Sequence, residues 1–293
     1  MADYVLTCCS TCDLTPVHLD RLGIRYVYFN YELGGEQCKD DFGRTHTQHE
    51  LYRRMRAGAT VRTSQVSTGE YLDLWRSLLK AGKDVLHVAL SSGISGTYGS
   101  ACTARDAIRQ EFPERRIEVI DSLCASSGLG LLLDTLAGLR NDGMSMDRLV
   151  AWAEAHKAEV NHWFFSSDLT FFVRGGRISR AAGAMGGLLR ICPVMEMDDE
   201  GALQVREKVR TKLRAQRRMV RKMHELAQGG DGYARKVFIS HSDCLRDARG
   251  VGDRIEREFP HLDGHVHYFD IGTTIGCHTG PGTVALFFWG TRR

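Results

Sequence analysis

The sequence lacks any long apolar run. No stretch of about 18 consecutive apolar residues occurs in the 293-residue chain, so no membrane-spanning helix is expected. Its first residues, MADYVLTCCS, lack the basic start and the apolar core of a secretory signal peptide. These two absences predict a cytoplasmic protein without an integral membrane segment.

The sequence also carries little net charge. Its 39 Lys and Arg residues nearly balance 36 Asp and Glu residues, which leaves a net charge of +3. This balance does not indicate a nucleic-acid partner. The exception is the run 206–222, where basic residues face a single acid, Glu207, but no aromatic residue is interleaved among them. The run is compatible with a solvated helix face, a surface for an acidic partner or, as an alternative to be tested, a nucleic-acid site.

Two catalytic signatures are missing from the segment LSSGISGTYGSA (90–101), which joins an expected strand to an expected helix. No Lys-Ser or Lys-Thr pair follows its glycines, so it is not a Walker A phosphate loop. Thr97 stands where the G-x-S-x-G motif of a nucleophilic serine needs a glycine. Taken alone, the segment favours a simple turn with Ser95 as the helix N-cap. The other interpretation is an anion site, because free N–H groups and the hydroxyls of Ser95 and Thr97 can hold a carboxylate without a lysine.

A second pair of metal ligands is also missing. Cys9 and Cys12 have the C-x-x-C spacing, and Cys8 lies beside them, but no second C-x-x-C or H-x₃₋₅-H pair accompanies them. The surrounding sequence does not resemble a thioredoxin-like redox site. An odd total of nine cysteines, without a signal peptide, predicts reduced structural thiols. No metal and no cofactor are expected.

Hydrophobic patterning predicts an α/β protein with two domains. In the first half, strand patterns alternate with helix patterns, which is typical of a parallel sheet with helices on both faces. In the second half, six strand patterns are separated by only two long helix patterns, at 211–228 and 245–258. We therefore expect an N-terminal α/β domain at 1–160 and a C-terminal α+β domain at 161–293, whose helices pack on one face of a mixed sheet.

Three further segments place polar side chains beside glycines or ahead of a helix. The segment VRTSQVSTGEY (61–71) offers Thr63 and Ser64 just before a capping box of Ser67 and Glu70. FFVRGGRISR (171–180) presents arginines around a flexible turn, and arginine suits carboxylate or phosphate. GCHTGPGT (276–283) sets His278 on an expected Gly-Pro-Gly loop, where it suits a hydrogen-bond donor or a proton carrier. Each segment alone is equally typical of a cap or a solvated turn.

Taken in order, these segments resemble the DegV family of bacterial lipid-binding proteins. The matching pieces also include Ser10-Thr11 with Asp13-Leu14, DS…SSGLG (121–130) and CPVMEMDDEGALQVREKVRT. The chain departs from the family pattern at Cys9, Val66 and Arg174, where aspartate, proline and lysine are usual. The first two departures affect loop shape near the site, and the third keeps the charge.

The resemblance implies a fatty acid buried between two domains. Its carboxylate would be held by Thr63, Ser64, Ser95, the backbone of Gly96 and His278, and its tail would lie in an apolar tunnel. Candidate tunnel residues lie in 169–173 and 183–195.

The resemblance also implies a carrier that is not itself an enzyme. In some bacteria such proteins present the fatty acid to a separate ATP-dependent kinase, which makes acyl phosphate. The residues associated with that step match Arg177, Arg210 and His278. The alternative is an enzyme that transfers phosphate or acyl groups through Ser95 or His278.

Overall fold

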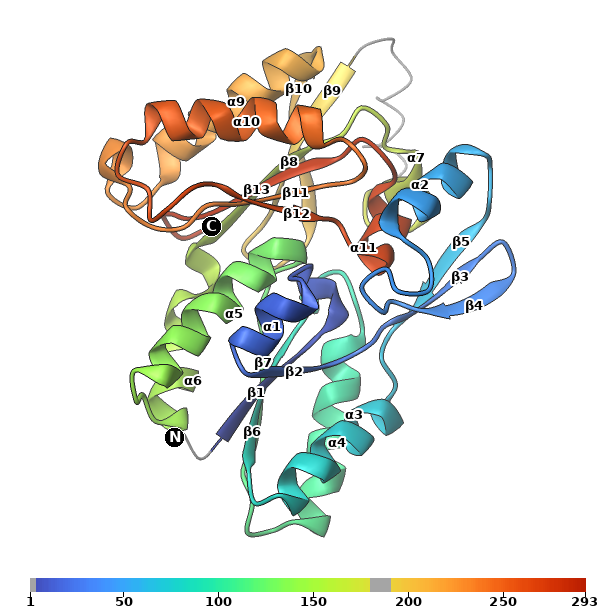
Figure 1. Cartoon of the computed structure of the whole chain (residues 1–293), viewed down its shortest axis with the longest axis vertical. Helices are drawn as coiled ribbons and strands as arrows, with labels where there is room; N and C mark the ends of the chain where they lie inside the picture. Colours follow the sequence, from blue (N-terminus) through green and yellow to red (C-terminus); the bar gives the residue numbers. More distant parts are fainter. Residues whose placement is uncertain (1–3, 180–190) are drawn as a thin grey trace.

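A computed structural model describes residues 4–179 and 191–293, and its first half contains a parallel four-stranded sheet. The strand order is β2-β1-β6-β7, and all three pairings are parallel. The strands are β1 (Tyr4–Cys9), β2 (Ile24–Val27), β6 (Asp84–Ala89) and β7 (Ile117–Asp121). Crossover helices lie on both of its faces (Figure 1), which confirms the predicted α/β architecture.

Alternation along the strands decides which helices cover which face. The helices are α1 (Pro16–Arg21), α3 (Thr68–Lys80), α4 (Thr97–Glu111), α5 (Ser126–Asn141) and α6 (Met146–His156). Val85 packs with α3 and α4, whereas its neighbour Leu86 packs with α1, α5 and α6. The predicted capping box starts α3, because Ser67 Oγ accepts from Glu70 N and the Glu70 carboxylate accepts from Ser67 N.

The second half forms a mixed six-stranded sheet with the order β10-β9-β8-β13-β11-β12. Only β11 and β12 pair in parallel. The strands are β8 (Val160–Phe165), β9 (Ile191–Met197), β10 (Leu203–Arg210), β11 (Phe238–His241), β12 (His267–Asp270) and β13 (Val284–Trp289). The two long helices, α9 (Lys212–Leu226) and α10 (Leu245–Glu258), cover one face, as expected.

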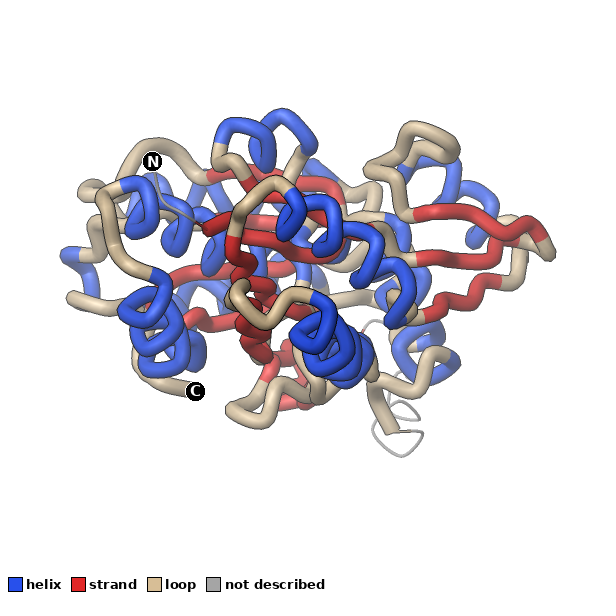
Figure 2. The backbone as a smooth tube through the Cα atoms, turned by 90° about the horizontal axis from the view of Figure 1, so that it is seen from below, coloured by secondary structure: helices blue, strands red, loops and turns tan. Residues whose placement is uncertain are grey.

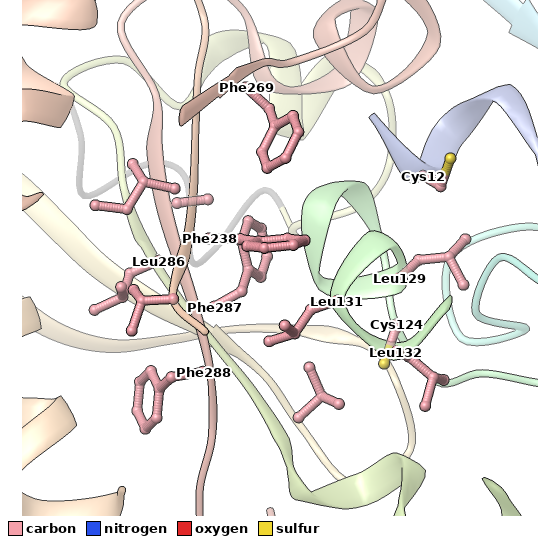
Figure 3. Packing of buried hydrophobic residues seen from close by; sticks show 14 of the residues in the cluster. Cys12, Cys124, Leu129, Leu131, Leu132, Phe238, Phe269, Leu286, Phe287 and Phe288 are labelled. Carbon is pink, nitrogen blue, oxygen red and sulfur yellow. The ribbon is translucent and has the colours of Figure 1, made fainter. Parts of the chain in front are cut away.

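Helix α5 joins the two sheets into one core. Leu131 points toward Phe238 and Phe287 of the six-stranded sheet, whereas Leu129 lies on the side of Cys12, which follows β1 (Figure 3). All five side chains are almost fully buried. Burial of large apolar side chains contributes roughly 1.5–3 kcal/mol each, so this shared core holds the two halves together. The boundary near residue 160 stays a prediction.

A third, small sheet was not expected from the sequence. It has the order β4-β3-β5 and is formed by β3 (Asn30–Leu33), β4 (Glu36–Lys39) and β5 (Val61–Ser64). Helix α2 (Gln48–Arg56) packs on it together with α11 (Thr273–Thr279), and α7 (Thr170–Arg174) packs on α11. Figure 2 shows this sheet projecting to one side of the molecule. Thr63 therefore lies on a strand, and His278 lies on a helix rather than on the expected loop.

No helix within residues 4–179 and 191–293 is long and apolar enough to cross a membrane.

Candidate functional site

An apolar cavity of about 230 Å³ lies between the two larger sheets. Its walls come from both halves of the chain, and α11 contributes part of the wall from the second half. The apolar lining residues are Phe29, Leu90, Ile94, Ala125, Phe164, Phe172, Met197, Leu203, Ile271, Ile275, Ala285 and Phe287. Phe172 comes from the expected tunnel segment 169–173. Of the other expected segment, 183–190 lies outside the described residues and 191–195 does not line the cavity. Such a cavity suits the hydrocarbon part of a ligand.

The polar end of the cavity brings together residues that are far apart in the sequence. Thr63 Oγ1 lies 2.8 Å from His278 Nε2, and Ser95, Gly96 and Arg177 line the same cavity. Five of the expected site residues are thus neighbours around one end.

Ser64 does not line the cavity and is exposed. Successive side chains on a strand point to opposite faces, so Thr63 and Ser64 of β5 cannot both face His278.

The Ser95 loop leads directly into α4. Gly96 is the N-cap residue of α4, and no side chain caps this helix, so the expected N-cap role of Ser95 is wrong by one position. Ser95 Oγ instead accepts a hydrogen bond from Thr97 N at 3.3 Å. A Cβ atom at position 96 would lie 2.3 Å from Gln65 Oε1, so any larger residue there would displace the Gln65 side chain. The loop therefore offers a hydroxyl and the positive end of a helix to the cavity.

Burial controls the charge of the histidine. Burial and the nearby Arg177 guanidinium lower the pKa of His278 to about 4, so its ring is neutral at pH 7. Its Nδ1 atom is buried against Gly175 without a hydrogen-bond partner in the described part of the chain. A neutral ring can donate from one nitrogen only.

Arg177 is fixed by carbonyl groups rather than by acids. Its Nε and Nη2 atoms donate to Ile94 O at 3.1 and 2.8 Å, and Nη1 donates to Gly175 O at 2.5 Å. Burial lowers the pKa of Arg177. These hydrogen bonds tie the Ser95 loop to the end of α7. Among the described residues no carboxylate forms an ion pair with Arg177, so its positive charge is not neutralised at the cavity.

Two buried acids, which sequence reasoning did not assign to the site, hold the start of α11. Asp13 Oδ1 accepts from Gly272 N at 3.0 Å, and Asp40 accepts from Thr273 Oγ1 at 2.5 Å and from Thr274 N at 3.3 Å. Burial, followed by the charge of Asp40, raises the pKa of Asp13. These acids fix the helix that carries His278. Asp13 belongs to one of the segments that match the DegV family, and this match was the only indication in the sequence that Asp13 lies near the site.

Neutral buried histidines make stability depend on pH. The pKa of His278 is lowered to about 4, and burial lowers that of His87 to about 3, from an ordinary value of 6.5. Below pH 6.5 the unfolded chain takes up protons that the folded chain refuses, so we expect the free energy of unfolding to fall steadily from pH 6.5 to 4. Urea denaturation at pH 7, 5.5 and 4.5 measures this. A His265→Asn variant, at an exposed position, should keep the wild-type dependence, and equal stability at pH 6.5 and 4.5 would contradict neutral burial.

A second hollow of about 650 Å³ adjoins the cavity, and we call it the arginine groove. It shares Thr63, Arg177 and His278 with the cavity. Its other lining residues are Gly58, Ala59, Thr60, Val61, Arg62, Phe171, Arg174, Gly175 and Cys277. The polar end of the cavity is thus also the floor of an outer, cationic groove.

Arg210 lines neither the cavity nor the arginine groove. Leu203 starts β10 and lines the cavity, whereas Arg210 ends the same strand and is exposed. At roughly 3.3 Å per residue, the two lie on the order of 20 Å apart.

Much of the basic run 206–222 is paired internally. Arg218 Nε lies 2.6 Å from Glu207, and Lys212 Nζ lies 2.7 Å from Asp247. Lys222 is 3.6 Å from Glu207 and 3.0 Å from Glu225. These ion pairs neutralise part of the charge that a nucleic-acid site would need.

One group of potential metal ligands occurs among the described residues: Glu36, Cys38 and His46. Cys38 Sγ lies 3.6 Å from Nδ1 of His46, whereas Glu36 lies 3.6 Å from Nε2, so the two face opposite sides of the ring. Arg54 Nη1 also lies 3.4 Å from both Nε2 and the Glu36 carboxylate. The arginine supplies the positive charge, and the group is an ion-pair cluster.

The cysteine cluster is fully buried. Cys8, Cys9 and Cys12 are free thiols, with Cys8 Sγ 4.0 Å from Cys12 Sγ. Burial raises the pKa of Cys9 to about 12, so that thiol stays protonated. This environment suits structural thiols.

Comparison with known proteins identifies the family. Residues 7–290 match the model of the family described as uncharacterised proteins of the DegV family. A DegV domain-containing protein of Clostridium perfringens is 31% identical over 290 residues, which cover 99% of this chain and 98% of that protein.

Solved structures share the fold. A fatty-acid-binding DegV family protein from Thermus thermophilus has 27% identity and a TM-score of 0.87, over 98% of this chain and 99% of that one. A stearic acid-binding protein from Eubacterium ventriosum has 25% identity and a TM-score of 0.84, over 97% of each chain. The Streptococcus pneumoniae Fatty Acid Kinase B3 protein, loaded with linoleic acid, has 20% identity and a TM-score of 0.86 over 99% of each chain, which shows the fold alone. Because the family model matches residues 7–290, the chain belongs to the DegV family.

Proposed function

We propose that this protein binds a long-chain fatty acid and presents it to a separate ATP-dependent kinase, which forms the acyl phosphate. The observation that carries the proposal is an apolar cavity that ends at the Thr63–His278 pair, beside the Ser95 loop. The tail fills the cavity. The carboxylate accepts hydrogen bonds from the hydroxyls of Thr63 and Ser95 near the N-terminus of α4, and the neutral ring of His278 orients Thr63 by donating from Nε2 to its Oγ1. Solved relatives that bind fatty acids support this assignment.

The site supports a carrier better than an enzyme. A nucleophilic serine needs a base within hydrogen-bond reach, but Ser95 Oγ is engaged by Thr97 N. His278 contacts Thr63 instead. Within residues 4–179 and 191–293, no histidine is hydrogen-bonded to Ser95. Phosphate transfer therefore belongs to the partner, which reaches the carboxylate through the arginine groove.

The Arg210→Ala variant is expected to impair presentation of the fatty acid to the kinase without impairing fatty-acid binding. Because Arg210 is exposed and does not line the cavity, Arg210→Ala should retain fatty acid fully but lower the rate of acyl-phosphate formation about tenfold, the effect of losing one charged hydrogen bond to the partner. The measurement combines purified protein, palmitate, ATP and the kinase, with acyl phosphate trapped as its hydroxamate.

Arg148→Ala on α6 removes the same charge from another exposed position and serves as the control. If Arg210→Ala supports acyl-phosphate formation at the wild-type rate, Arg210 does not bind the kinase. If wild-type protein binds palmitate but supports no acyl-phosphate formation by the kinase, the proposed presentation is wrong.

A further inference from the structure

The wall of the apolar cavity contains a hydroxyl group that makes no hydrogen bond and lies away from the polar end. Thr274 lines the cavity and is 3% exposed, and its Oγ1 atom is buried without a partner among the residues that the structure describes. Thr279 Oγ1 is in the same state, but Thr279 directly follows His278 and so belongs to the polar end. A buried hydroxyl without a partner is unfavourable, so the one at Thr274 calls for an explanation.

The position of Thr274 in α11 explains why the protein itself does not satisfy this hydroxyl. A threonine in a helix can donate to the carbonyl one turn earlier, but Thr274 is the second residue of α11 and has no earlier helical turn. Asp40 lies close, yet Thr273 Oγ1 donates to its Oδ1, and Ser10 Oγ and Thr274 N donate to its Oδ2. The Thr274 hydroxyl is therefore left to whatever fills the cavity.

Other polar side chains in the cavity wall already have partners. Apart from the polar end and Thr274, the polar lining residues are Gln65, Ser126, His162 and Thr283. Their hydrogen bonds are with Ser100 Oγ at 2.7 Å, Asp13 Oδ2 at 2.5 Å, Ala125 N at 3.3 Å and Thr279 O at 3.2 Å, respectively. Thr274 thus stands out from these lining residues by its unused hydrogen-bonding capacity.

Helix α11 places this hydroxyl beside the tail of a bound fatty acid. Thr274 and His278 are four positions apart, so they lie on the same helical face, and both line the cavity. At a rise of about 1.5 Å per residue, Thr274 lies about 6 Å from His278 along the helix axis. With the carboxylate held beside the Thr63–His278 pair, Thr274 faces carbons in the carboxyl half of the chain.

A plain hydrocarbon tail leaves the Thr274 hydroxyl without a partner. A hydroxyl group on the tail can both donate to it and accept from it. A site with a buried hydrogen-bonding group discriminates against ligands that lack the matching group. We propose that Thr274 binds a hydroxyl group in the carboxyl half of the acyl chain, so that the preferred ligand is a hydroxylated long-chain fatty acid. This inference rests on the proposed function, because it requires the tail to lie in the cavity.

Matched ligands that differ only in one hydroxyl test the inference. Palmitate and its 3-hydroxy, 6-hydroxy and 16-hydroxy derivatives are each titrated against delipidated protein by displacement of a fluorescent fatty acid. Wild-type protein is expected to bind the 3-hydroxy or the 6-hydroxy acid about fivefold more tightly than palmitate, because a hydrogen bond to Thr274 is added. The 16-hydroxy acid, whose hydroxyl is at the far end of the tail, should show no such gain.

The Thr274→Val variant should reverse the preference. Valine nearly matches threonine in volume but has no hydroxyl, so palmitate should bind about threefold more tightly than to wild type, whereas the preferred hydroxy acid should bind more weakly than palmitate. Opposite changes for the two ligands cannot come from a general loss of folded protein. Thr274→Ser keeps the hydroxyl and should keep the wild-type preference.

Three results would overturn the inference while leaving fatty-acid binding intact. They are equal binding of palmitate and the 3-hydroxy and 6-hydroxy acids by wild type, tightest binding of the 16-hydroxy acid, and a preference that survives in Thr274→Val or disappears in Thr274→Ser. If wild type binds none of the four acids, the proposed function itself fails.

Discussion

Thr63→Val combined with Ser95→Ala is expected to lower fatty-acid affinity by about a hundredfold or more. Each hydroxyl gives a hydrogen bond to a charged carboxylate, worth roughly 1.5–3 kcal/mol, and a hundredfold is about 2.8 kcal/mol. The variant should fold normally, because valine nearly matches threonine in volume and Ser95 is only half-buried. Displacement of a fluorescent fatty acid measures affinity, and thermal melting followed by circular dichroism checks the fold.

Ser64→Ala is the matched control for this variant. It removes a hydroxyl from the next position of the same strand, on the face away from the cavity, and should leave affinity unchanged. Wild-type affinity in the double variant would refute the head-group assignment, and an equal loss in Ser64→Ala would show that strand β5 matters for another reason.

The second large effect is expected from Gly175→Ala. A Cβ atom there would lie 2.2 Å from His278 Nδ1 and 3.1 Å from Phe171 O, so the histidine ring must shift and its contact with Thr63 is disturbed. We expect affinity for palmitate to fall about tenfold, as when a charged hydrogen bond is lost. Overpacking should also lower the free energy of unfolding by about 1–3 kcal/mol. Palmitate titration and urea denaturation measure these effects.

Gly138→Ala provides the contrast. Gly138 lies in α5, is exposed and has no other atom within 4 Å of the added Cβ, so alanine should stabilise the helix by roughly 0.5–1 kcal/mol. Its palmitate affinity should match that of wild type. If Gly175→Ala behaved in the same way, the close contact with His278 would not position the ring.

The regular elements were predictable because their signals are local. The capping box of Ser67 and Glu70 marks the start of α3, and the apolar run 84–90 marks β6. Both rest on periodicity or on residues three positions apart. The α/β class and the two long helices of the second half follow from the same kind of signal.

The assembly of the site was not predictable from such patterns. Strands β3, β4 and β5 have four residues each, and β4 and β5 carry exposed charged side chains, so a strand pattern is hard to detect in the sequence. The Thr63–His278 contact spans 215 positions, and only packing of α11 on the small sheet creates it. Asp13 and Asp40 fix α11 by contacts of equally long range. The order of family motifs indicated which residues belong together, but it did not exclude Ser64 from the cavity.

Mass spectrometry of the lipid carried by the purified protein tests the central claim most directly. Lipid is extracted from native protein, and delipidated protein is then incubated with a mixture of fatty acids and extracted again. We expect a single long-chain fatty acid per chain, which is retained by wild type and lost from the Thr63→Val, Ser95→Ala variant. Wild-type protein that carries no fatty acid, and that takes none up from the mixture, would contradict it.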